Sequence, residues 1–280
     1  ATFSFQNNNQ TSIGAGGYAE GPSLETLRGS DVFIDNGRTG LVLPTLGTEE
    51  LNLFIHETLH GFGLKHPGYG PDPILSDIEL GFEFTRMMLL NEMDQISIGI
   101  LDIAALQYLY GVNKNARASN DTYLINELEA NFIWDGDGTD EIDGSRLSAG
   151  ATVYLTAGLH GFVGPIVNDF ITAPGQITIN FGTKIENLTG SNFTDQLYGN
   201  ELQNIIIGKA GNDFIDGKAD DDIIAGGLGD DKLTGGAGSD TFRYSKGDGN
   251  DTILDFNSAV DRLEYSGFSE LEKSTFIESV

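Results

Sequence analysis

The feature that most restricts the fold is a glycine that recurs every nine residues in the last third of the chain. Six glycines keep this spacing: Gly190, Gly199, Gly208, Gly217, Gly226 and Gly235. Five positions after them stand Asp195, Asn204, Asp213, Asp222, Asp231 and Asp240, and two positions later Leu197, Ile206, Ile215, Ile224, Leu233 and Phe242. A six-residue loop and a three-residue strand make half a turn of a parallel β-roll. The sequence therefore predicts a β-roll over residues 190–243 with the apolar column inside; the alternative, a glycine/aspartate linker, does not need that column.

The aspartates of the repeat predict calcium binding. Glycines allow the tight loop, and each aspartate places carboxylate oxygen where Ca²⁺ can bridge neighbouring loops. Without the ion the stacked carboxylates repel one another, so we expect this part to fold only with calcium. Residues 217–222 carry a weaker signal because Asp220 replaces the third glycine, and the first two units are expected to bind poorly or not at all. The candidate calcium-binding residues are Gly208, Gly211, Asp213, Gly217, Asp222, Gly226, Gly229, Asp231, Gly235, Gly238 and Asp240.

A second carboxylate-rich loop precedes the repeat. Asp135, Asp137 and Asp140 alternate with glycines directly after a strand expected at residues 131–134. This loop is either a plain turn or a further calcium site, since carboxylates and carbonyls are the ligands that calcium prefers.

A metal-binding string lies in the first third of the chain. His56 and His60 are spaced to share one helix face, and a turn at Gly63 can deliver His66 as a third imidazole. Three imidazoles with an open fourth position hold a catalytic zinc. Glu57 is placed to act as the general base on a zinc-bound water. The alternative is an amphipathic helix that happens to carry histidines.

The remaining pattern predicts strands and helices around these motifs. Strands are expected at residues 1–6, 13–19, 30–35, 151–156 and 176–181, and helices at 48–61 and 101–110, the second ended by Gly111. Tyr18 is either an ordinary surface aromatic or part of an edge strand along which a peptide substrate lies extended.

Composition narrows the partners. The formal net charge of −27 would repel nucleic acid and anionic membranes. The chain has no cysteine, which excludes disulfides and thiolate metal ligands. No apolar run is long enough to cross a bilayer, so no membrane span is expected.

Together, the zinc string and the repeat resemble the serralysin family of secreted bacterial metalloproteases. Residues 102–111, 134–140 and 185–187 are also similar to segments of that family. The resemblance implies an α+β metzincin-type catalytic domain over residues 1–112, shortened at its N-terminus, and an all-β domain over residues 113–280 that carries the parallel β-roll. It further implies a secreted zinc metalloendopeptidase with one catalytic Zn²⁺ and several structural Ca²⁺ ions. A monomer is expected, with protein or peptide substrates, a one-step secretion system and a proteinaceous inhibitor as partners.

The resemblance also assigns roles to single residues. It makes His56, His60 and His66 the zinc ligands, Glu57 the base, and Met87 the methionine of the turn beneath the metal. Members of the serralysin family resemble one another in having a tyrosine two residues after that methionine, where this chain has Leu89. That tyrosine helps to stabilise the transition state, so we expect this enzyme to be slower than one that has it, but still active. The alternatives are a non-catalytic calcium-binding RTX module with a vestigial zinc site, or a purely structural zinc.

Overall fold

The computed structural model describes residues 4–8, 17–20, 31–35, 58–59, 64, 100–166 and 171–268. The chain divides into two compact units, Ala1–Gly111 and Val112–Val280. The boundary predicted from sequence, after residue 112, lies one residue later than this division. In the described residues, no helix combines the length and apolar character needed to cross a membrane.

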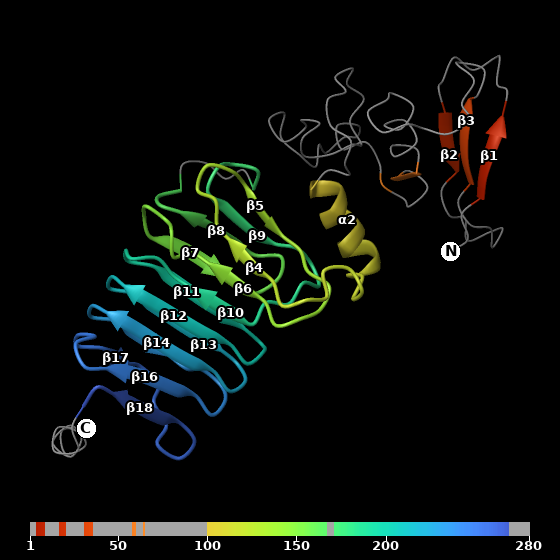
Figure 1. The fold of residues 1–280 in the computed structure, drawn as a ribbon. Coiled ribbons are helices and arrows are strands. Elements are labelled where there is room, and N and C mark those ends of the chain that lie inside the picture. The colour runs from red at the N-terminus through yellow and green to blue at the C-terminus, as the bar shows by residue number, and fades with distance from the viewer. Residues whose placement is uncertain are drawn as a thin grey trace. The chain divides into compact units, whose positions relative to one another are not determined.

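The described strands of the first unit form a small mixed sheet (Figure 1). It contains β1 (Ser4–Asn8), β2 (Gly17–Glu20) and β3 (Asp31–Asp35). β3 lies in the middle, parallel to β1 and antiparallel to β2. All three strands overlap the ranges expected from sequence.

The helix predicted at residues 101–110 is confirmed as α2 (Ile100–Tyr110). Gly111 ends it with a φ of +77°, and its amide donates to the carbonyl of Gln107 at 2.8 Å. A left-handed residue after the last turn is a common helix stop, and glycine adopts it without a steric penalty.

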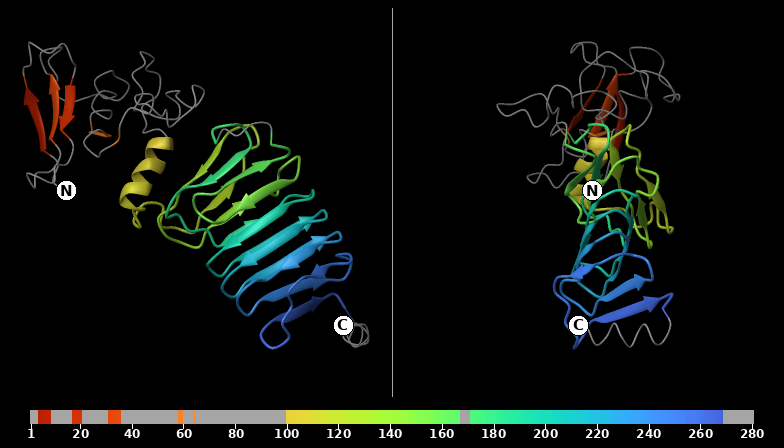
Figure 2. Two further views of the ribbon diagram at one scale, coloured as in Figure 1. Left: turned by 180° about the vertical axis from the view of Figure 1, so that it is seen from behind. Right: turned by 90° about the vertical axis from the view of Figure 1, so that its left-hand side faces the viewer.

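The second unit is a β-solenoid of two sheets (Figures 1 and 2). The seven-stranded sheet has the order β18-β16-β14-β12-β10-β6-β4, and all its pairs are parallel. Its strands are β4 (Thr122–Leu124), β6 (Glu141–Asp143), β10 (Asn187–Thr189), β12 (Ile205–Ala210), β14 (Ile223–Leu228), β16 (Thr241–Ser245) and β18 (Arg262–Ser266).

The second sheet has eight strands in the order β17-β15-β13-β11-β7-β8-β9-β5. These are β5 (Asn131–Ile133), β7 (Ala151–Tyr154), β8 (His160–Val163), β9 (Gln176–Ile179), β11 (Gln196–Asn200), β13 (Phe214–Lys218), β15 (Lys232–Thr234) and β17 (Thr252–Ile253). Only β8 runs antiparallel to its neighbours. From β10 onward, successive strands alternate between the two sheets, as the nine-residue unit requires.

The apolar column of the repeat forms the interior of this solenoid. Register confirms the pattern, since Leu197 pairs with Ile215 and Ile206 with Ile224 in neighbouring turns. All six column residues are at most 2% exposed. Burying a side chain of this size contributes roughly 1.5–3 kcal/mol relative to leaving it exposed. The β-roll prediction is thus confirmed, and the linker alternative is wrong.

Candidate calcium-binding loops and zinc string

The aspartates of the repeat form hydrogen-bonded ladders between turns. Each lies directly before a strand, and its carboxylate Oδ1 accepts the backbone amide of the residue one turn earlier. Four such bonds run along the repeat: Asp195 to Asp213 (2.8 Å), Asp213 to Asp231 (2.8 Å), Asn204 to Asp222 (2.7 Å) and Asp222 to Asp240 (3.0 Å). These bonds fix the carboxylates at the loop ends of both sheets.

The other carboxylate oxygen is left without a partner in three turns. Asp213, Asp222 and Asp231 are only 1–2% exposed, and the Oδ2 atom of each has no hydrogen bond. A buried, unpaired anionic oxygen is costly, and such a group in a native fold demands an explanation. Hard oxygen ligands fixed between glycine loops suit calcium, so the residues present fit the predicted ion.

Burial makes these carboxyl groups poor anions in the absence of a cation. It raises the pKa of Asp213 to about 7, of Asp222 to about 8 and of Asp231 to about 6. Neighbouring carboxylates add to the rise, among them Asp240 beside Asp222. A bound divalent cation would reverse this effect by stabilising the charged form.

The first glycine of each loop is required by the carboxylate that faces it. A Cβ atom at Gly208, Gly217, Gly226 or Gly235 would lie closer than 3.0 Å to the aspartate of the same unit. The third glycines, Gly211, Gly229 and Gly238, have φ angles of +133°, +138° and +159° and press against the backbone of the preceding turn. Asp220 takes this third position in its own unit with a φ of +72°, which aspartate tolerates better than most residues.

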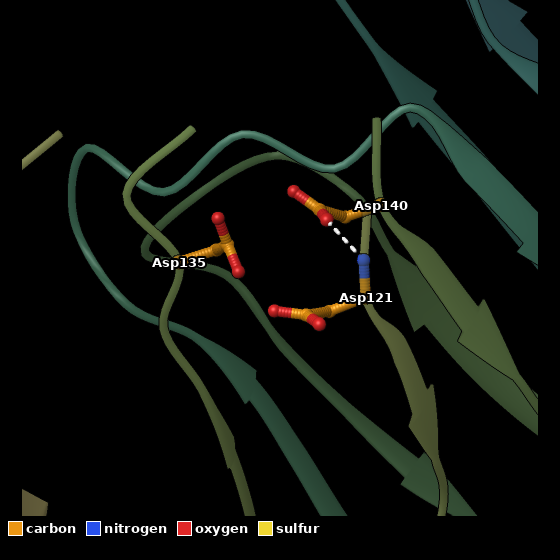
Figure 3. A group of neighbouring side chains, drawn as sticks. All are labelled: Asp121, Asp135 and Asp140. Carbon is orange, nitrogen blue, oxygen red and sulfur yellow. Dashed lines mark hydrogen bonds between the residues drawn. The ribbon is translucent and has the colours of Figure 1, made fainter. Parts of the chain in front are cut away.

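A separate carboxylate cluster lies where the solenoid begins (Figure 3). Asp121, Asp135 and Asp140 bring ligand oxygens within 4.8 Å of one another, the one such group in the described part of the chain. The Asp121 amide donates to Asp140 Oδ1 at 2.8 Å, and the Tyr123 hydroxyl donates to Asp135. Asp137 lies outside the cluster: its side chain is exposed, and its amide donates to Asp135 Oδ1 at 3.0 Å.

The cluster therefore joins two of the three predicted residues with one that sequence reasoning missed. Asp121 lies directly before β4, in the same position relative to its strand as the aspartates of the repeat. The sequence did not reveal Asp121 as a candidate because it is not a multiple of nine residues away from the aspartates of the repeat. Burial, with Asp135 and Glu186 nearby, raises the pKa of Asp140 to about 6. A bound cation would stabilise the charged form of Asp140 and so lower its pKa.

The predicted zinc site falls outside the described residues. His56, Glu57, His60, His66 and Met87 all lie there, as does Leu89.

Within the zinc string, the structure describes Thr58 and Leu59 as helical. The Leu64 amide donates to the Leu59 carbonyl at 3.1 Å, a bond of the six-to-one type that closes helix C-termini. Leu59 and Leu64 are buried and pack with Ala105 and Leu106 of α2. These two residues of the string are thus held against α2.

Tyr18 lies in β2, opposite Phe33 of β3. Among the described strands, β2 is at one edge of its sheet.

Comparison with known proteins finds a family of calcium-binding repeats in the second unit and metallopeptidase relatives along most of the chain. The RTX calcium-binding nonapeptide repeat (four copies) matches five overlapping stretches, 182–215, 189–224, 198–233, 207–242 and 216–253. Metallopeptidase AprA of Pseudomonas marginalis is 34% identical over 99% of this chain. Serralysin G of Dickeya chrysanthemi is 32% identical over 84% of it, and serralysin of Proteus mirabilis 31% over 68%.

The solenoid and these matches define a protein with RTX calcium-binding repeats. More narrowly, the chain is a serralysin-like protein that carries such repeats. It spans 43% to 63% of the length of the three relatives named above.

Proposed function

We propose that this chain acts as a secreted zinc-dependent metalloendopeptidase with a calcium-stabilised β-roll. The observation that carries the proposal is the string from His56 to His66, present in a chain that aligns over 99% of its length with a metallopeptidase. A random helix has no reason to combine two histidines one turn apart with a glycine turn and a third histidine.

The chemistry divides between the metal and this chain. Zinc, when bound by His56, His60 and His66, acidifies a water molecule and polarises the peptide carbonyl. Glu57 takes the proton from the attacking water and returns it to the leaving amine. Strand β2 carries Tyr18 and is at the edge of its sheet among the described strands, where its backbone groups could pair with an extended substrate.

The contacts around the string support this arrangement. Helical geometry at Thr58 and Leu59 is what the spacing of His56 and His60 needs. The bond from Leu64 to Leu59 is the kind that ends a helix shortly before His66. Packing of Leu59 on α2 would orient the helix that carries both ligands.

Glu57→Gln tests the proposal directly. Hydrolysis of a quenched peptide should require zinc, stop with a chelator, and be lost in this variant while zinc content stays at one per chain. Glu50→Gln, the same change on the same predicted helix, should cleave at the parental rate. Cleavage by Glu57→Gln at that rate would refute the assigned role.

The β-roll has a supporting role in this proposal. Calcium bound at Asp213, Asp222, Asp231 and Asp240 would stabilise the solenoid, and the Asp121 cluster offers one more site. Extracellular calcium would then fold the domain after export through the one-step secretion system. Protein substrates, a monomeric state and a proteinaceous inhibitor complete the proposal.

One observation favours a second function. Leu89 stands where serralysins resemble one another in a tyrosine, which removes an electrophilic helper near the metal. The chain would then be a calcium-binding RTX module with a vestigial zinc site. A folded, zinc-loaded sample without chelator-sensitive cleavage would decide for this alternative.

A further inference from the structure

The first turns of the repeat are closed by hydrogen bonds that the later turns lack. Asp213, Asp222 and Asp231 each keep one buried oxygen without a partner. Asp195 and Asn204, at the same position in the first two units, have partners for every side-chain oxygen or nitrogen. This difference divides the solenoid into two chemically distinct parts.

Asn204 is the clearest case. It is fully buried, and its Oδ1 accepts the Asn200 amide at 2.9 Å. Its Nδ2 donates to the Glu186 carbonyl and to Asn200 Oδ1, both at 3.2 Å. The amide group thus supplies donors where a carboxylate would present a bare oxygen.

Asn200 completes the same network from the second position of the loop, where the four later units have Lys209, Lys218, Gly227 and Gly236. Its Nδ2 donates to the carbonyls of Ile185 at 2.8 Å and Leu155 at 3.4 Å. Two amide groups together therefore satisfy carbonyl oxygens of the neighbouring turn, as a cation would.

Asp195 is closed in another way. Its Oδ2 accepts the Ser191 amide at 2.6 Å, and its Oδ1 accepts the Ala151 amide at 2.6 Å and the Ser191 hydroxyl at 2.9 Å. Burial still raises the pKa of Asp195, but these three donors lower it and so offset part of the cost of the buried charge without a metal.

We propose that these closures replace calcium in the first turns, so that residues 151–166 and 171–207 form a calcium-independent template for the turns that follow. The later turns, residues 208–266, need the ion to offset their unpaired carboxylate oxygens. The template offers them a start: the amides of Asp195 and Asn204 donate to Asp213 and Asp222, the first two calcium-dependent rungs. The inference rests on the proposed calcium binding of the later turns.

Hydrogen exchange of the full chain, with calcium and after its removal, tests this division. Amides of β7, β9, β10 and β11 should stay protected in the metal-free protein, while those of β13 to β16 should lose protection. Equal loss in both groups would overturn the template but leave calcium binding intact. Full protection everywhere without calcium would instead refute the proposed role of the ion.

Asn204→Asp makes the test specific. The new carboxylate cannot donate to Glu186 or Asn200, so metal-free protection of β10 and β11 should fall at least about tenfold. Calcium should restore it. Asn212→Asp is the matched control, because it makes the same change at an exposed position and should leave the template unchanged. Unchanged metal-free protection in Asn204→Asp, or no recovery with calcium, would contradict the proposal.

Discussion

The backbone amide of Asp195 donates to the carboxylate of Asp213, eighteen residues further on, at 2.8 Å. The bond joins two turns of the solenoid through the same group that would hold calcium. Metal binding and the stacking of turns are therefore coupled. If the Asp213 carboxylate moves, the Asp195 amide in the turn before it loses its acceptor. In a solenoid each turn contacts only its neighbours, so such links contribute to the coupling between successive turns.

Removing one carboxylate charge should weaken calcium binding at that loop. In Asp222→Asn the amide oxygen can still accept from Asn204, and its NH₂ group replaces the unpaired oxygen. We expect the calcium concentration for half-maximal folding to rise by at least about tenfold, or ~1.4 kcal/mol. Calcium titration by circular dichroism measures this. Asp216→Asn, whose carboxylate pairs with Lys218 on the outer face, should leave the midpoint unchanged.

The metal-free repeat should be more stable in acid than at neutral pH. Folded pKa values of about 7 for Asp213 and about 8 for Asp222 lie above the ordinary value of 3.8. A raised folded pKa contributes stability below the unfolded value, and this is lost as pH rises through the folded one. Order in residues 208–266 should therefore decrease between about pH 4 and pH 8 without calcium. Hydrogen exchange in metal-free buffer checks the trend, and increasing order with pH would contradict it.

Two glycines separate backbone strain from steric conflict. Gly229 and Gly247 both have positive φ, +138° and +105°. A Cβ at Gly229 would overlap the Gly211 carbonyl, whereas a Cβ at Gly247 meets nothing within 4 Å. Gly247→Ala should cost about 1–3 kcal/mol of unfolding free energy from strain alone. Gly229→Ala should cost clearly more, and equal losses in calcium-saturated denaturant melts would show that the close approach is unimportant.

The inward column should dominate the stability of the roll. Ile224 is fully buried, and Ile224→Ala should cost about 2–5 kcal/mol in calcium-saturated protein. Ile207 directly follows the column position Ile206, on the opposite face of the strand, and is 40% exposed. Ile207→Ala should change the unfolding free energy by less than about 0.5 kcal/mol. Guanidinium unfolding gives both values, and a comparable loss in the two variants would place the core elsewhere.

The repeat made residues 190–243 of the solenoid predictable because one local rule generates them. Gly208, Asp213 and Ile215 recur at the same positions in the units that follow. Their alignment identifies the loop glycine, the carboxylate that pairs with the next turn, and the buried apolar residue of each unit. α2 was predictable for a similar reason, since an apolar run ends at Gly111. Both cases depend on local pattern that tertiary contacts reinforce.

The remaining features depend on contacts that spacing does not reveal. Asp121 approaches Asp135 and Asp140 only because β4 pairs with β6, which no periodicity announces. The turn containing Asn200 and Asn204 looked like a degenerate repeat, yet its amides form a closed network. The antiparallel β8 lies between β7 and β9 and interrupts the parallel sheet, and no repeat in the sequence predicts it.

Asp251 and Asp261 lie beyond the nine-residue register, yet they accept the amides of Asp231 and Asp240 at 3.1 and 3.0 Å. These two residues therefore complete both hydrogen-bonded ladders, because they pair the backbone amides of the last two aspartates of the repeat. A chain cut after residue 246 would therefore lose more than its final strands. The backbone amides of Asp231 and Asp240 would lose their acceptors, and we expect the shortened solenoid to unfold first at that end.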